Sequence, residues 1–279
     1  MGRDFEIKTA SGPRSCRVWL LEQATWQPVF NGASIAAIRH GQPAFLGDVE
    51  PGRPPGLEGH FCQWLFILSR IYPDAAPLTV RLPPDGARLT LLDLVHGAQS
   101  LCHGASDLSW ALPVFCRWGR GTWTNRFGKR YTLDSLAETH LRQEDVSTAC
   151  FGTHWRMGIA CSVAESADRF SRSTRRQLRD SLRRLIEEAR DLCNPDGRFR
   201  LEPSPPGGPP FEAVVSFQAH TLEWLMVALP AEAVRSEPWV NQAIARLLAD
   251  IGSPNHLTYG TRCHAATALR AYLSKTDGP

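Results

Sequence analysis

Several stretches of this chain are apolar at nearly every position over two or more helical turns, and each opens on a polar residue. Three of them are GHFCQWLFILSR, GTHWRMGIA and AHTLEWLMVALP, whose first histidines are His60, His154 and His220. A helix that is apolar all round is buried inside a protein. The pattern therefore predicts inner helices that begin at these histidines, and Asp107 and His264 open two further segments of the same kind.

The five predicted helix starts recur along the chain, at steps of 47, 47, 66 and 44 residues. A period near 45 residues is typical of helix–turn–helix units that stack into solenoids or rings. The step of 66 residues contains the segment LEPSPPGGPPFE at residues 201–212. Its prolines and glycines prevent this segment from forming a helix. We expect this insertion to join an outer to an inner helix and to overhang His220 as a lid.

The segments between these starts are apolar on one side only. RLTLLDLVHGAQSLC and RYTLDSLAETHLRQ share Arg-x-Thr-Leu-x-x-Leu, in which Thr90 and Thr132 are predicted N-caps. RFSRSTRRQLRDSLRRLIEEARDLC places Leu178, Leu182 and Leu185 at helical spacing, with arginines on the other face. The alternation of buried and one-sided helices predicts an all-α fold, an α/α toroid: an incomplete or complete double-layered helical barrel of about 45-residue helical-hairpin repeats.

Strand patterns are short and lie early in the chain. FNGASIAAIRHGQPAFLGDV is expected to hold one or two strands, and PLTVRLP at residues 77–83 another. We therefore predict an N-terminal segment over residues 1–54 that packs on the barrel. The toroid repeat domain follows over residues 55–273, and residues 274–279 form a disordered tail.

Composition narrows the classes of protein. With 279 residues and 43% hydrophobic content, the chain is long enough for a substantial core. A net charge of +3 is too small to indicate a nucleic-acid partner. The sequence shows neither a signal peptide nor a membrane span, and its eight cysteines form no CxxC pair. We expect a cytoplasmic protein without membrane span or nucleic acid, and leave open a small-molecule ligand and a protein partner.

Histidine and tryptophan gather at the predicted helix starts. His60 and Trp64, like His220 and Trp224, are four residues apart and share a helical face. If all inner helices begin at one mouth of a ring, these side chains line a central cavity, where histidine binds metal, transfers protons or contacts a polar ligand. In the alternative interpretation each histidine bonds the backbone of the next helix and only fixes the repeat geometry. The predicted ligand-binding residues are His60, Trp64, Asp107, Trp155, Glu223, Trp224 and His264.

The acidic residues near the helix starts also have two interpretations. A carboxylate beside a histidine, as Asp107 or Glu223 would be, forms a general-base pair. Acids at the beginning of a helix also serve as caps. The predicted catalytic residues are His154, His220 and Asp145.

A metal is the one cofactor that the sequence indicates. Cys150 and His154 lie four residues apart, with Asp145 and Glu144 close before them. Thiolate and imidazole together suit zinc, so Cys150, His154 and Asp145 are the predicted zinc ligands. The alternative is a small buried cysteine and a capping histidine.

The order of outer helix, NPDGRF, insertion and inner helix resembles the prenyltransferase and squalene-cyclase class of α/α toroids. In that class a Pro-Asp-Gly turn followed by an aromatic residue closes each outer helix, as residues 195–199 would here. CFGTHWRMGIA, NPDGRF and AHTLEWLMVALP are similar to an uncharacterised group of planctomycete toroid-like proteins, over residues 55–273. The resemblance implies the toroid fold and no particular reaction.

The chain departs from the catalytic motifs of that class. It has no Asp-x-Asp-Asp motif, no Gln-Trp repeat and no Asp-Asp-x-x-Asp motif. Asp145, Cys150 and His154 are not spaced like the zinc ligands of the protein prenyltransferases. Two functions therefore stay open. One is a toroid whose His/Trp-lined cavity binds or transforms a small apolar or sugar-like molecule. The other is a non-catalytic scaffold or protein-interaction module with structural histidines.

Overall fold

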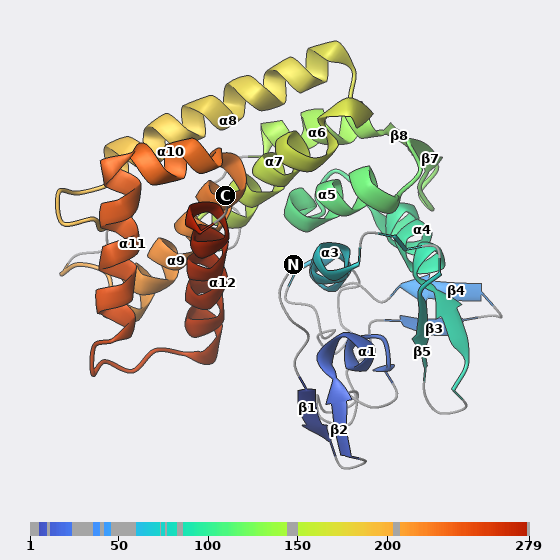
Figure 1. Ribbon diagram of the computed structural model, residues 1–279. Helices are drawn as coiled ribbons and strands as arrows, with labels where there is room; N and C mark the ends of the chain where they lie inside the picture. The colour runs from blue at the N-terminus through green and yellow to red at the C-terminus, as the bar shows by residue number, and fades with distance from the viewer. Residues whose placement is uncertain are drawn as a thin grey trace. The chain divides into compact units, whose positions relative to one another are not determined.

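A computed structural model of the chain describes residues 6–9, 12–23, 36–39, 42–45, 60–72, 74–75, 77–82, 86–143, 150–202 and 207–277. The chain divides into two compact units, Met1–Leu136 and Ala137–Pro279 (Figure 1). The boundary predicted after residue 54 lies outside the described residues and stays a prediction. The structure is mostly helical, as expected from the sequence.

The first unit combines short hairpins with helices. Its strands are β1 (Glu6–Thr9), β2 (Gly12–Ser15), β3 (Ala36–Arg39), β4 (Gln42–Phe45), β5 (Thr79–Arg81), β6 (Arg88–Thr90), β7 (Thr122–Thr124) and β8 (Arg130–Thr132). They pair consecutively into four antiparallel two-stranded hairpins. The predicted strands are confirmed as β3, β4 and β5. The helices are α1 (Cys16–Leu20), α3 (Gln63–Ile71), α4 (Leu91–Leu101) and α5 (Leu108–Trp118), and α3 and α4 both pack against α5.

The repeated Arg-x-Thr-Leu motif marks the passage from a hairpin into a helix. Thr90 ends β6 and caps α4, because its Oγ1 accepts from the backbone N–H of Asp93 at 3.1 Å. Thr132 ends β8 and caps α6 (Leu133–Arg142) in the same way, with its Oγ1 3.0 Å from the backbone nitrogen of Ser135. The two predicted N-caps are confirmed. The strands before them were not predicted.

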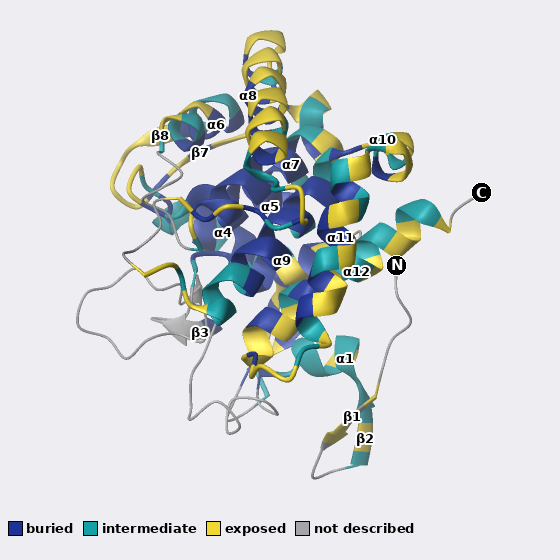
Figure 2. Ribbon diagram, turned by 90° about the vertical axis from the view of Figure 1, so that its left-hand side faces the viewer, coloured by how far each residue is buried: buried dark blue, intermediate teal, exposed yellow. Residues whose placement is uncertain are grey.

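The second unit is built around one central helix. Its helices are α7 (Thr153–Ser166), the 3₁₀ turn η3 (Ala167–Arg169), α8 (Arg172–Leu192), α9 (Phe211–Ala228), α10 (Ala231–Ser236), α11 (Pro238–Ile251) and α12 (Tyr259–Thr276). Helix α9 packs against α7, α11 and α12 and also contacts α8 (Figure 1). The burial pattern in Figure 2 distinguishes α7 and α9, which are buried over most of their length, from α8, which exposes its arginine-rich face. The predicted alternation of buried and one-sided helices is confirmed for these three.

Two predicted helix starts are wrong. Helix α9 begins at Phe211, so His220 is its tenth residue and lies about 13.5 Å along the axis from the helix start. Helix α12 begins at Tyr259, and His264 is its sixth residue. Only one face of α12 is buried, and it continues to Thr276, through part of the predicted tail. Residues 203–206 of the predicted lid lie outside the described residues.

The Pro-Asp-Gly turn after α8 needs its glycine. Gly197 has φ +84°, a left-handed conformation that side chains disfavour. A Cβ atom at this position would lie 2.3 Å from the carbonyl oxygen of Gln242 in α11. The predicted left-handed glycine is therefore present, and the turn lies directly on α11.

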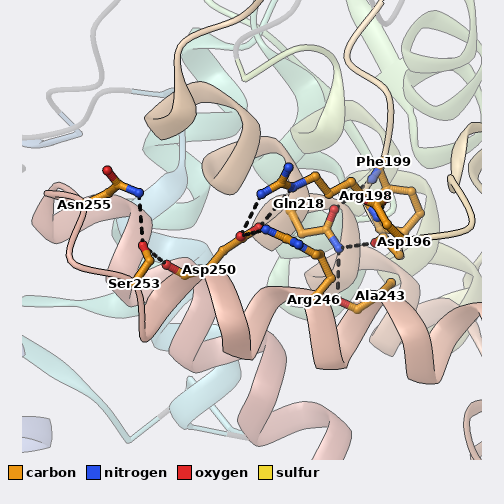
Figure 3. Close-up of polar contacts among 10 residues, drawn as sticks. Asp196, Arg198, Phe199, Gln218, Ala243, Arg246, Asp250, Ser253 and Asn255 are labelled. Atoms are coloured by element: carbon orange, nitrogen blue, oxygen red, sulfur yellow. Dashed lines mark hydrogen bonds and ion pairs between the residues drawn. The ribbon is translucent and has the colours of Figure 1, made fainter.

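Two buried polar groups hold that turn in place (Figure 3). The Gln218 side chain in α9 accepts from the backbone N–H of Phe199 at 2.9 Å and donates to the carbonyls of Gly197 and Ala243 at 2.8 and 3.0 Å. The buried Asp250 carboxylate binds Arg198 at 3.0 Å and also pairs with Arg246. These contacts fix α8, α9 and α11 together.

Candidate functional site

Three histidines from three helices of the second unit come together. They are His154 in α7, His220 in α9 and His264 in α12, and we call them the histidine cluster. The ring centroids of His220 and His264 are 3.7 Å apart, and that of His154 lies 5.1 Å from His220 and 6.4 Å from His264. The prediction that these histidines converge is confirmed for the three in this unit.

The imidazole of His220 is oriented by its own helix. Its Nδ1 lies 2.8 Å from the carbonyl oxygen of Ser216, one turn earlier in α9. A carbonyl only accepts hydrogen bonds, so Nδ1 carries the proton and Nε2 is the basic nitrogen of the neutral ring. His220 is itself buried, and one of its ring nitrogens lies within 4.8 Å of a Glu223 carboxylate oxygen and of a His264 ring nitrogen.

A carboxylate from α9 orients the third histidine. Glu223 follows His220 by three residues and therefore lies on the same face of α9. Its Oε2 accepts a hydrogen bond from His264 Nδ1 at 2.8 Å. The Glu223 side chain is 10% exposed and that of His264 is 29% exposed. A nearly buried carboxylate thus holds an imidazole that solvent reaches.

His154 lies at the start of α7, after an unusual turn. Cys150, Phe151 and Gly152 have φ of +54°, +58° and +75°, a conformation that costs free energy in the two residues with side chains. The Thr153 hydroxyl donates to the carbonyl of Cys150 at 2.6 Å. This turn carries Cys150 Sγ to within 4.8 Å of a ring nitrogen of His154.

The arrangement offers two kinds of chemistry. One ligand atom each from His220, Glu223 and His264 lie within 4.8 Å of one another, as in a group that binds a metal ion. The same Glu–His pair is also the arrangement in which a carboxylate orients a general base. The predicted zinc set of Cys150, His154 and Asp145 stays a prediction, because Asp145, like the neighbouring Glu144, lies outside the described residues.

The remaining predicted histidine pairs with a predicted acid in the first unit. His60 Nδ1 lies 3.3 Å from Asp107 Oδ2. Asp107 is also the N-cap of α5 and accepts from the backbone N–H of Ser109 at 3.0 Å. Burial raises the pKa of Asp107, but hydrogen bonds from His60 and Ser109 outweigh it and lower the pKa to about 2. The capping interpretation of Asp107 is thus confirmed.

The three predicted tryptophans are interior packing residues. Trp224 is fully buried, and Trp64 and Trp155 are nearly so. Trp155 Nε1 donates to the carbonyl oxygen of His140 at 2.7 Å, which secures α7 against the end of α6. Among the described residues no cavity accompanies them. Of the three histidines in the cluster, His264 is the partly exposed one, whereas His154 and His220 are buried.

Sequence reasoning missed the groups that orient the cluster. His220 donates to the main-chain carbonyl of Ser216. Every residue has such a carbonyl, so the residue type at position 216 does not indicate this hydrogen bond. Glu223, the partner of His264, was predicted as a site residue. Its hydrogen bond to His264, which is 41 positions away in the chain, was not predicted. The i, i+3 spacing of His220 and Glu223 was the one signal present in the sequence.

Comparison with known proteins gives this chain no relative: it matches no protein family, no curated protein and no solved structure. The resemblance to the prenyltransferase and squalene-cyclase toroids stays a prediction. None of the helices that the structure describes is both long and apolar enough to span a membrane.

Proposed function

We propose that the second unit binds a small polar molecule at the histidine cluster and acts on it there. The polar side chains of the cluster favour a hydroxyl-bearing, sugar-like ligand over a purely apolar one, because imidazole and carboxylate groups gain little from contact with apolar surface. The ligand would approach along the exposed side of His264 and meet His220 and His154 behind it.

The observation that carries this proposal is the Glu223–His264 pair. A carboxylate that is 10% exposed has lost much of its hydration, and a structural role would be served as well by a neutral side chain. Its oxygen fixes the ring of a histidine that remains accessible. Orienting an accessible imidazole is what a binding or proton-accepting residue requires.

We infer that both units are built on the layering of α/α toroids. In the second unit, α8 packs against α7 and contacts α9, and α11 packs against α9 and α12. In the first unit, α4 packs against α5, which packs against α3. In the second unit, α8 and α11 thus each contact two neighbouring helices. Such contacts between an outer and an inner layer of helices support the toroid prediction.

A scaffold is the second candidate, and the packing of the tryptophans favours it. Trp224 contributes its indole entirely to the interior, and His220 bonds its own helix. On this interpretation the cluster only fixes the spacing of α7, α9 and α12, and a protein partner would bind elsewhere.

Ligand-observed NMR with a panel of monosaccharides and short polyols distinguishes the two. The proposal predicts at least one compound whose signals broaden with the wild-type chain and not with His264→Ala. His256→Ala is the matched control, because His256 is an exposed histidine of the same unit, and it should bind as the wild type does. Binding that survives His264→Ala, or no binding by any compound, favours the scaffold.

A further inference from the structure

We propose that His220, Glu223 and His264 form a binding site for a divalent transition-metal ion, with zinc as the first candidate. The inference rests on the proposed function, because the ion would be the group through which this site takes its ligand. It differs from the zinc site predicted from Cys150 and His154, since its donors come from α9 and α12.

The spacing of the donor atoms is the first argument. One atom from each of the three residues lies within 4.8 Å of the other two. In a tetrahedral zinc site with bonds of about 2.1 Å, neighbouring ligand atoms are about 3.4 Å apart. Side-chain rotations would bridge this difference. The hydrogen bond between His264 and Glu223 would be replaced by bonds to the ion, and its proton would be released to water when the ion binds through these two atoms.

The orientation of the rings is the second argument. A metal-binding histidine usually donates its other ring nitrogen to a carbonyl or carboxylate, which fixes the tautomer. His220 does this through Nδ1 and the Ser216 carbonyl. Its Nε2 lone pair is therefore in the state that a metal needs, without loss of a proton from the ring.

The placement on the helices is the third argument. His220 and Glu223 are separated by three residues of α9, so both project from one face of a rigid, mostly buried helix. The third donor comes from the neighbouring helix α12, which packs against α9. Donors fixed on packed helices lose little side-chain freedom when an ion binds.

The donor types select the class of ion. Two imidazoles and one carboxylate suit zinc and related transition ions, whereas calcium and magnesium prefer oxygen donors throughout. Three protein donors leave a coordination position for water or a ligand, as in catalytic zinc sites. His154, whose ring centroid is 5.1 Å from that of His220, would flank that position and contact what binds there.

The test is the metal content of the full-length chain. Protein purified without chelator, and protein stripped with chelator and reloaded with Zn²⁺ or Co²⁺, would be analysed by mass spectrometry of the metals. We expect about one equivalent per chain, with a Co²⁺ absorption spectrum typical of four-coordinate nitrogen and oxygen ligation. His264→Ala should bind at least tenfold more weakly.

Two controls separate loss of ligation from loss of fold. His264 is partly exposed, so its replacement should leave the circular dichroism spectrum unchanged, and His256→Ala should keep the full metal content. His220→Gln removes a second proposed metal ligand, at a buried position, and should also weaken metal binding. A chain that takes up no metal after reloading, or a His264→Ala variant that binds as tightly as the wild type, overturns the proposal.

The failure of this inference is distinguishable from the failure of the proposed function. The monosaccharide and polyol panel would be repeated on the stripped chain. Ligand binding that depends on His264 and persists without metal refutes the metal site and leaves the proposed function standing. Metal binding at full stoichiometry without ligand binding supports the metal site and refutes the proposed ligand class.

Discussion

Glu223 Oε2 lies 2.8 Å from His264 Nδ1, although the two residues are 41 positions apart in the chain. The contact connects α9 to α12 beside the close pair of His220 and His264, whose ring centroids are 3.7 Å apart. It brings a negative charge next to two imidazoles in a setting that is mostly buried.

Glu223→Gln should separate the charge of this side chain from its shape. Glutamine is nearly isosteric and its Oε1 still accepts from His264, so we expect the free energy of unfolding to change by less than about 1 kcal/mol. Zinc affinity should fall at least about tenfold. Isothermal titration with Zn²⁺ measures this against Glu232→Gln, which replaces an exposed acid of the same unit. Equal affinities for the two variants would remove Glu223 from the site.

Gly197→Ala should destabilise the second unit strongly. The added Cβ would face the Gln242 carbonyl at 2.3 Å in a left-handed conformation, so a loss of about 2 kcal/mol or more is expected. Gly207 is the matched control, because its φ is +86° and nothing lies within 4 Å of its added Cβ. Gly207→Ala should cost about 1 kcal/mol. Urea unfolding that gives similar losses for both variants would show that the close approach to α11 is unimportant.

Gln218→Ala should loosen the turn after α8. The side chain makes three hydrogen bonds to main-chain groups of two segments, and their loss leaves buried polar groups unsatisfied, at a cost of about 2 kcal/mol or more. Hydrogen exchange of the Phe199 amide reports the effect locally. Unchanged protection of that amide in the variant would contradict the role assigned to Gln218.

Acid should weaken the first unit through Asp107. Its pKa in the folded chain is about 2, lowered from an ordinary value of 3.8 because hydrogen bonds from His60 and Ser109 outweigh burial. A lowered folded pKa contributes stability that is complete above the unfolded value and is lost as the pH falls through the folded one. Between pH 4 and pH 2 we expect a loss of about 2 kcal/mol from this group.

Asp107→Asn tests that assignment, because asparagine still caps a helix but does not titrate in this range. Urea unfolding at several pH values should show a flatter dependence between pH 4 and pH 2 for the variant. Parallel curves for the variant and the wild type would assign the acid sensitivity to other carboxylates.

Local chemistry made part of the fold predictable. Thr90 and Thr132 were identified as N-caps because a cap depends on residues within one turn. The spacing of apolar residues in each segment predicts that α7 is buried and that α8 has one solvent-exposed face. The strands β6 and β8 were missed because three residues, such as Arg-Tyr-Thr, are too few to show an alternating pattern.

The start of α9 was misplaced for a physical reason. The repeat pattern put it at His220, whereas Pro210 at the N-cap and Glu212 in the first turn were the local start signals. The pairing of Glu223 with His264 depends on how two helices pack, which no short stretch of sequence encodes. The sequence could therefore predict which histidines belong to the cluster, but not the distances and hydrogen bonds among them.

Anomalous diffraction at the zinc absorption edge tests the central claim most directly. Crystals of the full-length chain, grown after loading with Zn²⁺, would be measured on both sides of the edge. The account predicts one strong anomalous peak within bonding distance, about 2.1 Å, of His220 Nε2, of a ring nitrogen of His264 and of a Glu223 carboxylate oxygen. A peak at other residues only, or no peak in a fully loaded sample, would contradict it.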